Sequence, residues 1–244
     1  MVTRYVVADD GTEPAQAAER WAIVHATLAH VPCVTLRVQG PDRSEQNLVS
    51  IRSQHDSGVR LLRGSIWRTL ADTVHPSDVL VIGTGKSGFI HGRVYGARGL
   101  QIVVSVPCDV AVVPQVDLHF RSGVVAGLDR HETAALIARA AAAEAAARAE
   151  PLLLLHASFE DPGARRGSDT VIDIGIAAVL ATWPNVLVRA RRTQRPAAEA
   201  LLDASRTAAL MVLGPGSMNA GSPVGTVLHD VLVNINVPVL VARR

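Results

Sequence analysis

The chain has 244 residues, of which 48% are hydrophobic and only 3% are aromatic. Its cores must therefore be built mainly from alanine, valine, leucine and isoleucine. The formal net charge of +2 at pH 7 is nearly balanced, which gives no strong attraction to nucleic acid or anionic lipid. No segment approaches the roughly 18 consecutive apolar residues of a membrane span. We therefore expect neither a nucleic-acid partner nor a membrane partner.

The two cysteines, Cys33 and Cys108, lie in apolar contexts and form no CxxC motif. Two cysteines in a chain of this length exclude a disulfide scaffold, and buried free thiols in a reducing cytosol are expected. Asp9 and Asp10 stand where a signal peptide would need its apolar core. The nine histidines show neither HxxxH nor HExxH spacing. The sequence therefore predicts a cytoplasmic protein without a metal site.

Strands and helices alternate in the first half of the chain. Thr12 is the expected N-cap of the first helix, whose buried face carries Ala18, Trp21, Ala22 and His25. The expected strands cover residues 5–8, 34–38, 59–62, 79–82 and 110–113. The expected helices cover residues 13–28 and 65–74, with a shorter one around residues 45–53 and a helical segment before the last strand.

The second half repeats this order. The expected strands cover residues 124–128, 152–157, 186–191, 210–213 and 239–241. The expected helices cover residues 132–149, 169–182 and 196–206, with a further helical segment before the last strand. Alternating strands and helices predict right-handed crossovers and a parallel sheet with helices on both faces. In such sheets ligands bind at the carboxyl ends of the strands, beside a switch in strand order.

The repeat is visible in the spacing of single residues. Gly96 and Gly225 are 129 positions apart (225 − 96), and Asp10 and Asp129 are 119 apart (129 − 10). A repeat of this length indicates two copies of a domain rather than a solenoid. We therefore expect two domains, covering residues 1–117 and 118–244.

A glycine-rich stretch follows the fourth strand of the first half. Gly83, Gly85 and Gly88 match the GxGxxG pattern of dinucleotide-binding sites. That pattern belongs after the first strand of a unit, so a dinucleotide-dependent enzyme is the less favoured alternative. A P-loop is excluded, because its first glycine would have to stand at Leu80.

Longer segments carry a more specific resemblance. In the first half these are VVADDGTEPAQAAERWA, VLVIGTGKSGFIHGRVYGARG and VPCDVAVVP, and in the second VVAGLDRHETAAL, LGPGSMNAGSPVGT and VPVLVARR. Each half resembles a universal stress protein domain, so the chain resembles the tandem, two-domain form of that family. The resemblance implies an α/β fold of the adenine-nucleotide α-hydrolase type, with two tandem, open-twisted, five-stranded parallel-sheet domains and helices on both faces.

The family's ATP-binding branch also implies a site. Its glycine loop reads G-x2-G-x9-G-(S/T), its first turn carries an acidic residue, and backbone at the end of the second strand meets adenine. The first half offers Asp10, Val38, Gly83, Lys86 and Gly96, but Lys86 replaces a glycine and Ala97 replaces the final hydroxyl. The second half offers the corresponding residues Asp129, Ala157, Gly214, Gly225 and Thr226, in a loop that is two residues shorter. The longer loop slightly favours the first half.

The implied function is that of a cytoplasmic stress-response protein with ATP, and magnesium with it, or another adenine nucleotide as a regulatory ligand. No catalytic residue is expected, and any ATP hydrolysis would be slow. A nucleotide-free protein-interaction module remains the alternative, because the glycines also suit a tight turn. The family pairs domains through their last strands, which implies a pseudo-dimer of the chain's own two domains, with a homodimer as a further expectation.

Three local features have simpler interpretations. Asp9 and Asp10 are consecutive strand residues with opposite facing, so shared acid–base work is not expected. His156 is interpreted as a satisfied core or edge histidine. The arginines of the second half's third strand and the loop after it form a solvated edge rather than a nucleic-acid surface. They are Arg189, Arg191, Arg192 and Arg195.

Overall fold

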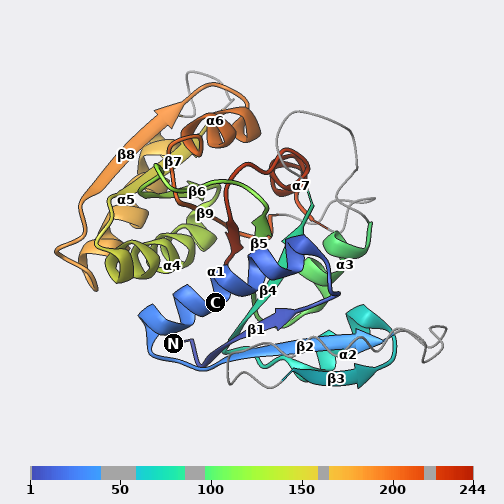
Figure 1. Cartoon of the computed structure of the whole chain (residues 1–244). Helices are drawn as coiled ribbons and strands as arrows, with labels where there is room; N and C mark the ends of the chain where they lie inside the picture. The colour runs from blue at the N-terminus through green and yellow to red at the C-terminus, as the bar shows by residue number, and fades with distance from the viewer. Residues whose placement is uncertain (1, 40–58, 86–96, 159–164, 217–223, 244) are drawn as a thin grey trace.

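The computed structural model of the chain describes residues 2–39, 59–85, 97–158, 165–216 and 224–243. Within them the protein is α/β, as predicted, with one ten-stranded, mostly parallel sheet and seven helices (Figure 1). The short helix expected around residues 45–53 lies outside the described residues, and so do Lys86 and Gly96. None of the described helices is long and apolar enough to cross a membrane.

The element boundaries follow the predicted order. The strands are β1 (Arg4–Ala8), β2 (Cys33–Gln39), β3 (Arg60–Arg63), β4 (Asp78–Thr84), β5 (Asp109–Pro114), β6 (Val124–Leu128), β7 (Leu152–Ala157), β8 (Val188–Thr193), β9 (Leu210–Leu213) and β10 (Val239–Val241). The helices are α1 (Glu13–Ala29), α2 (Ile66–Thr73), α3 (Ala97–Ser105), α4 (His131–Arg148), α5 (Arg165–Leu180), α6 (Ala197–Ala204) and α7 (Thr226–Val233).

The strand order is β3-β2-β1-β4-β5-β10-β9-β6-β7-β8. Each half therefore contributes five parallel strands in the same order, with its first and fourth strands adjacent. The two last strands, β5 and β10, pair antiparallel, and Ala111 lies opposite Leu240. These two residues are 129 positions apart (240 − 111), so each faces its own counterpart in the repeat. The pairing of the last strands that the family resemblance implied is observed.

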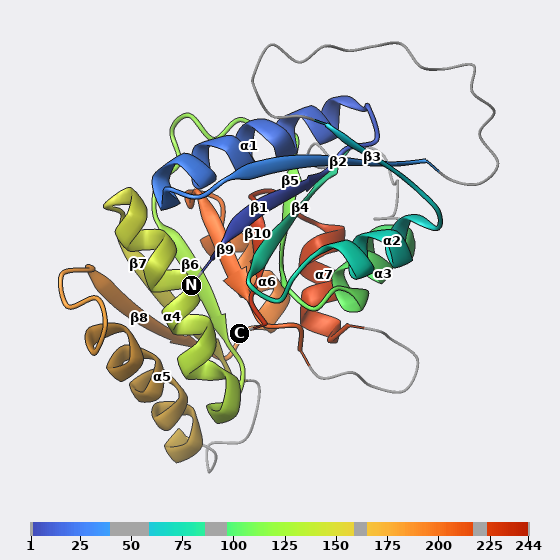
Figure 2. The same ribbon diagram turned by 90° about the horizontal axis from the view of Figure 1, so that it is seen from below.

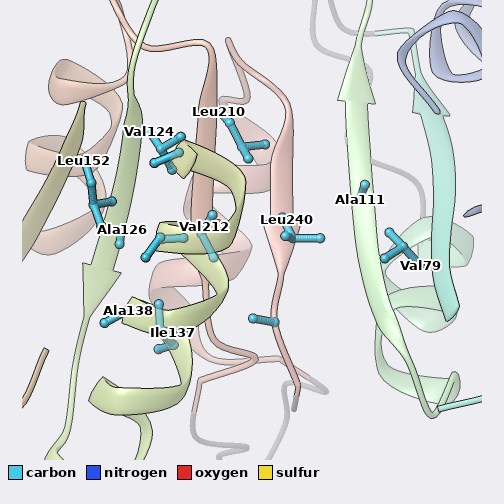
Figure 3. Close-up of a cluster of buried hydrophobic side chains, with 14 of the residues drawn as sticks. Val79, Ala111, Val124, Ala126, Ile137, Ala138, Leu152, Leu210, Val212 and Leu240 are labelled. Atoms are coloured by element: carbon cyan, nitrogen blue, oxygen red, sulfur yellow. The ribbon is translucent and has the colours of Figure 1, made fainter. Parts of the chain in front are cut away.

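The sheet has a hydrophobic core on each face. Helices α1, α4 and α5 cover one face, and α2, α3, α6 and α7 cover the other (Figure 2). Figure 3 shows Ile137 and Ala138 of α4 against Ala126 and Val212 of the sheet. Alanine-rich helices lie close to a sheet because their side chains are short, which explains how a core with few aromatic residues is filled.

Local sequence determines how the first helix begins and which face it buries. Thr12 accepts a hydrogen bond from the Ala15 N–H at 3.4 Å, so the predicted N-cap is confirmed. Trp21 and His25 are buried, as the helical spacing predicted. The helix ends at His30, whose φ of 54° is left-handed, and α4 ends in the same way at Ala149. The repeat therefore extends to the ends of corresponding helices.

Helix α5 begins at Arg165 rather than at residue 169, which is the largest shift from prediction. The edge strand β8 is shifted by two residues. It begins at Val188 rather than at residue 186, because the Val186 N–H is used in a turn to the Trp183 carbonyl. Arg189, Arg191 and Arg192 are exposed, in agreement with the predicted solvated edge. Charged side chains on an edge strand oppose pairing with another sheet.

The two cysteines are free, but only one is fully buried. Cys108 is buried, whereas Cys33 is half-buried, which corrects the expectation of two buried thiols. Cys33 belongs to β2, which pairs with the exposed strand β3 near the sheet edge. Partial burial raises the pKa of the Cys33 thiol to about 11, with the charge of Glu19 adding to the effect.

Helices α1 and α4 meet across the junction of the halves at three polar residues, His25, Glu144 and Arg148. The His25 ring stacks on Trp21 with a centroid distance of 3.5 Å, lies 3.9 Å from the Glu144 carboxylate and contacts the Arg148 guanidinium. Burial, and then the charge of Arg148, lower the pKa of His25 to about 3. His25 is therefore neutral at pH 7 in the folded protein.

Candidate functional site

A cavity of about 300 Å³ lies at the carboxyl ends of β6, β7 and β9, beside helices α6 and α7. This is the edge of a parallel sheet at which ligands bind, next to the point where the strand order reverses. The strand ends and the turns after them contribute Gly127, Leu128, Asp129, Leu155, Ala157, Leu213, Gly214 and Gly216. Helices α6 and α7, together with the residue just before α7, contribute Ala197, Leu201, Gly225, Thr226, Val227 and Leu228.

The apolar wall of the cavity follows from strand alternation. Leu155 and Ala157 are two apart on β7, so both side chains point to the face covered by α6 and α7. An added Cβ on Gly127 would lie 2.5 Å from Leu213 Cδ2 and 2.9 Å from Leu201 Cδ2, so glycine here lets both leucine side chains pack against the strand. A leucine-lined wall of this kind suits a flat, apolar group such as a heterocyclic base.

The other end of the cavity is built from glycine backbone. Gly216 has a φ of 73°, and a Cβ there would lie 2.8 Å from the Gly225 Cα. The Gly225 N–H also donates to the Pro215 carbonyl at 3.1 Å. The two ends of the glycine loop are thus held together, immediately before Thr226 begins α7. Backbone N–H groups at such a helix start attract an anion.

Asp129 follows β6 at the rim of the cavity. Its Oδ1 accepts hydrogen bonds from the Arg130 N–H at 2.8 Å and the Thr133 hydroxyl at 2.6 Å, and its Oδ2 lies 3.3 Å from Arg130 Nε. The carboxylate is thereby oriented by the first turn of α4. It is the one ionisable side chain among the described lining residues of the cavity.

His156 lies between two lining residues but points to the opposite face of β7. It is buried, and its Nδ1 lies 2.8 Å from the Leu128 carbonyl oxygen. The interpretation of His156 as a satisfied core histidine is therefore confirmed. Its hydrogen bond fixes the end of β6 against β7, just before Asp129.

The predicted second-half residues converge. Asp129, Ala157, Gly214, Gly225 and Thr226 all line this single cavity. The helix α6 residues Ala197 and Leu201 also line it, and sequence analysis did not select them. Their spacing on a predicted amphipathic helix identifies a buried face, but no local signal says that this face borders a cavity.

The first-half candidates are arranged differently. Asp10 is exposed, and its Oδ1 accepts from the Thr12 N–H at 3.1 Å and hydroxyl at 2.6 Å. A Cβ on Gly83 would collide with the Pro14 carbonyl and lie 2.7 Å from the Ala15 N. The start of α1 therefore packs directly on the beginning of the first glycine loop. Val38 is half-buried at the end of β2.

An ion pair covers the turn after β1. Arg37 Nε donates to Asp9 Oδ2 at 3.1 Å, and the Asp9 Oδ1 accepts from the Gly11 N–H at 2.8 Å. Asp9 therefore has a structural partner in Arg37. The pairing with Arg37 spans 28 positions of sequence, which is why no local pattern indicated it.

Among the described residues, no group of three or more His, Cys, Asp or Glu side chains is arranged to hold a metal ion. The observed arrangement in the second half instead offers an apolar wall, a carboxylate and a helix start in one cavity. These are the elements needed to bind a small molecule with one apolar and one anionic end.

Curated relatives carry one family name. The chain is 24% identical to a universal stress protein of Mycobacterium tuberculosis, over 98% of this chain and 96% of the relative. It is 29% identical to one of Mycobacterium bovis, over 75% of this chain and 64% of the relative. No family model matches the chain.

Solved structures show the same fold. A universal stress protein of Archaeoglobus fulgidus matches 99% of this chain and 98% of its own, with a TM-score of 0.77 at 13% identity. A putative universal stress protein of Pseudomonas aeruginosa matches 99% of this chain and 93% of its own, with a TM-score of 0.67 at 15% identity. The resemblance to tandem universal stress proteins stated from the sequence is confirmed.

Proposed function

We propose that this chain, which is similar over nearly its full length to universal stress proteins, binds an adenine nucleotide as a regulatory ligand in its second half. One observation carries the proposal. Five residues expected at a nucleotide site, scattered from Asp129 to Thr226 in the sequence, line one cavity. We place the ligand in the second half for this reason, while Lys86 and Gly96 of the first-half loop lie outside the described residues.

The residues that line the cavity suit both the base and the phosphate end of such a ligand. Leu155 and Leu201 supply the apolar wall that a purine needs, and Gly216 and Gly225 bring backbone close to the start of α7. Thr226 places a side-chain hydroxyl at the same point. Asp129 accepts hydrogen bonds at the rim, which suits a ribose hydroxyl as donor. Each group thus has a role in binding, and none is arranged as a nucleophile with a base.

The finer parts of the proposal follow the family. They are a regulatory role in a stress response, ATP with magnesium as one candidate form of the ligand, a cytoplasmic location, and two domains at residues 1–117 and 118–244. The pairing of β5 with β10 supports a chain that acts as a dimer of its own halves. The dimer of two chains is proposed on the family resemblance alone.

The test is calorimetric titration of the full chain with AMP and with ATP, with and without magnesium, after release of any co-purified nucleotide. The informative variant is Ala157→Leu, because Ala157 lines the cavity and leucine would fill part of it. We expect binding to weaken at least tenfold. Ala147→Leu makes the same chemical change at an exposed position of α4 and serves as the matched control.

Two outcomes would contradict the proposal. The first is absence of binding heat in the wild-type protein with either nucleotide, which would favour the nucleotide-free interaction module. The second is binding that Ala157→Leu and Ala147→Leu leave equally strong, which would remove the ligand from the second-half cavity. Titration with a nicotinamide dinucleotide in the same series tests the dinucleotide-dependent alternative.

A further inference from the structure

A second cavity lies at the opposite end of the second half, where helices α4 and α5 end, and we call it the helix-end cavity. Its volume is about 490 Å³, and its lining residues come from the segments 145–151 and 182–187, both within the described residues. Pro151 lines it and precedes Ala157 of the first cavity by six positions (157 − 151). At a rise of about 3.3 Å per residue these two residues are roughly 20 Å apart, so the two cavities are separate sites.

Two helices present their carboxyl-terminal ends to the helix-end cavity. A helix that connects two parallel strands runs antiparallel to them. Helices α4 and α5, which lie side by side, therefore both end near the amino ends of the parallel strands β7 and β8 (Figure 2). The carbonyl groups at such a helix end carry about half a unit of negative charge. Two helix ends at one cavity attract a cation.

A carboxylate adds a full negative charge. Glu150 follows the end of α4, is half-buried and lines the cavity. Its Oε2 accepts a hydrogen bond from the Gly123 N–H at 2.8 Å, which orients the side chain. Because a carboxylate has about four acceptor positions, this one hydrogen bond leaves capacity for an ammonium or guanidinium group of a ligand.

The repeat shows that the helix end itself does not need this carboxylate. The counterpart of Glu150 in the first half is Val31 (150 − 119). The Glu150 N–H donates to the Ala145 carbonyl at 2.9 Å, and the Val31 N–H donates to the Ala26 carbonyl at 3.0 Å. The two helix ends therefore share this backbone hydrogen bond, and of the two positions the one in the second half carries a charge.

The remaining wall of the cavity is mainly apolar and is fixed by a turn. Trp183 and Val186 pack against the core beneath α4 and α5, and the Val186 N–H donates to the Trp183 carbonyl at 3.1 Å. Pro184 and Leu187 line the cavity beside them. Tryptophan is the side chain whose ring attracts a cation most strongly. The volume is also within the range of small-molecule sites, roughly 300 to 1,000 Å³.

The arginines nearest in the sequence have other partners or face away. The Arg148 guanidinium lies 3.3 Å from the Glu144 carboxylate. Arg121 donates to a backbone carbonyl at 2.5 Å. Val188 packs on the core beneath α4 and α5, so Arg189, the next residue of β8, points to the other face of the sheet. The Glu150 carboxylate is thus not the partner of these three cations.

We infer that the helix-end cavity binds a small organic cation, an ammonium or guanidinium group carried on a flat apolar body. Glu150 and the two helix ends hold the charged group, and Trp183 with the apolar turn holds the body. The site is independent of the nucleotide proposed for the first cavity. It gives the chain a second ligand, of opposite charge, at the other end of the same strands.

The test compares three probes with a similar body in NMR titrations of the full chain. They are 2-phenylethylamine, which is cationic, 2-phenylethanol, which is neutral, and phenylacetate, which is anionic. The readout is the chemical shift of the Trp183 indole N–H and of the backbone N–H groups in segments 145–151 and 182–187. We expect saturable shifts with the amine, at least tenfold weaker binding of the alcohol, and no saturable shift with phenylacetate. Raising NaCl from about 50 to about 300 mM should weaken amine binding, because salt screens the attraction.

One variant separates ligand binding from a purely structural role of the carboxylate. Glu150→Gln keeps an oxygen that can accept the hydrogen bond from Gly123 but removes the charge. We expect a folded protein that binds the amine at least tenfold more weakly. Glu132→Gln makes the same chemical change at an exposed position in the first turn of α4, and it should bind the amine as the wild type does.

Three results would overturn the inference. They are the absence of saturable shifts in the two segments with the amine, binding of the alcohol as tight as that of the amine, and folded Glu150→Gln protein with wild-type affinity for the amine. If Glu150→Gln does not fold, the three probes on the wild-type protein still decide. None of these results bears on nucleotide binding in the first cavity, which Ala157→Leu tests separately.

Discussion

The two halves share a strand order, but they treat the turn after their first strand differently. In the first half this turn carries Asp9, which pairs with Arg37 of the neighbouring strand. In the second half the corresponding positions are Leu128 and His156, joined through the Leu128 carbonyl at 2.8 Å. The first arrangement places an ion pair over the turn, whereas the second places its polar contact on the face of β7 opposite the cavity.

The helix that follows also differs. In the first half Pro14 packs on Gly83 so closely that no Cβ fits. Its counterpart in the second half, Thr133, donates to Asp129 instead, and a Cβ on Gly214 would lie 3.0 Å from Ile137 Cδ1. One fold thus supports a tighter and a looser approach of the first helix to the glycine at the end of the fourth strand. The difference comes from a few side chains at the strand ends, while the sheet and its register are the same.

The largest expected effect comes from adding one methyl group at the paired glycines. Gly83→Ala forces a Cβ into the backbone of Pro14 and Ala15, which cannot move without displacing α1. Gly214→Ala meets only the flexible end of Ile137. We expect a loss in unfolding free energy of about 3 kcal/mol or more for Gly83→Ala and about 1 kcal/mol or less for Gly214→Ala.

Urea denaturation of the two variants measures this difference. Because both carry the same chemical change, the intrinsic effect of replacing glycine by alanine is common to them. Equal losses would mean that the close approach of α1 to Gly83 is not a distinguishing feature of the first half, and the comparison of the halves would lose its main support.

The next largest loss of unfolding free energy is expected when a buried ion pair is broken. Asp78 of β4 is 1% exposed and pairs with Arg4 of β1 at 2.8 Å. Its counterpart in the repeat is Ala209. Burial alone would raise the pKa of Asp78, but hydrogen bonds from Arg4, the His75 N–H and Thr3, together with the charge of Arg4, hold it below the ordinary value. We expect Asp78→Ala to lower the unfolding free energy by about 2–3 kcal/mol.

The pH dependence of this pair has a definite sign. Since the folded-state pKa of Asp78 is lowered, its stabilising contribution is present above about pH 4 and is lost as the pH falls further. Asp203→Ala, which breaks the exposed contact with Arg195 in the second half, is the control and should leave the denaturation midpoint nearly unchanged. Similar losses of unfolding free energy in Asp78→Ala and Asp203→Ala would contradict the expected difference between the buried and the exposed ion pair.

Short-range patterns predicted most of the fold. The apolar strands β7, β9 and β10 were predicted to the residue, because a buried strand is a continuous apolar run between turn residues. The edge strand β8 was misplaced by two residues, since both of its faces are largely exposed and its sequence shows no period. The repeat itself followed from glycines and acidic residues at turns, where few side chains are tolerated.

The site was predicted only in part, for a physical reason. Gly214, Gly225 and Asp129 are found from turn and loop patterns, which are local. The Asp9–Arg37 pair and the contact of Pro14 with Gly83 depend on strands and helices meeting in space. Sequence spacing does not report such contacts. The meeting of the second-half residues at one cavity could therefore be seen only in the structure.

A smaller effect is expected at the junction of the halves. His25 has a folded-state pKa of about 3, lowered first by burial and then by the charge of Arg148. Because the unfolded histidine takes up a proton near pH 6.5 and the folded one does not, stability falls as the pH drops below 6.5 and continues to fall towards pH 3. Between pH 7 and 5 the loss should be on the order of 1–2 kcal/mol.

Denaturation at several pH values checks this slope. Burial raises the pKa of the neighbouring Glu144, which opposes the effect, so the contribution of His25 is taken from the difference between wild type and His25→Gln. That variant should flatten the dependence between pH 7 and 5. His75→Gln changes an exposed histidine and should keep the wild-type slope. A slope that survives in His25→Gln would place the titrating group elsewhere.

The smallest change in unfolding free energy is expected for the ion pair between Asp9 and Arg37. Arg37→His installs the residue that the second half has at this position and removes the ion pair over the first turn. Arg37 is 31% exposed and Asp9 14%, so water screens the pair, and the loss in unfolding free energy should be about 1 kcal/mol or less. It should shrink further in high salt, because screening weakens such pairs.

Nucleotide titration of the same variant tests whether the Asp9–Arg37 pair limits ligand binding in the first half. If Arg37 alone keeps ligand from the first half, Arg37→His gains a second binding event that Ala157→Leu does not remove. We expect no such gain, because Pro14 still packs on Gly83 in this variant. The backbone of α1, rather than the Arg37 side chain, sets the distance between α1 and Gly83. A gained site would show that the two halves differ in ligand binding because of the Arg37 side chain rather than because of the position of α1.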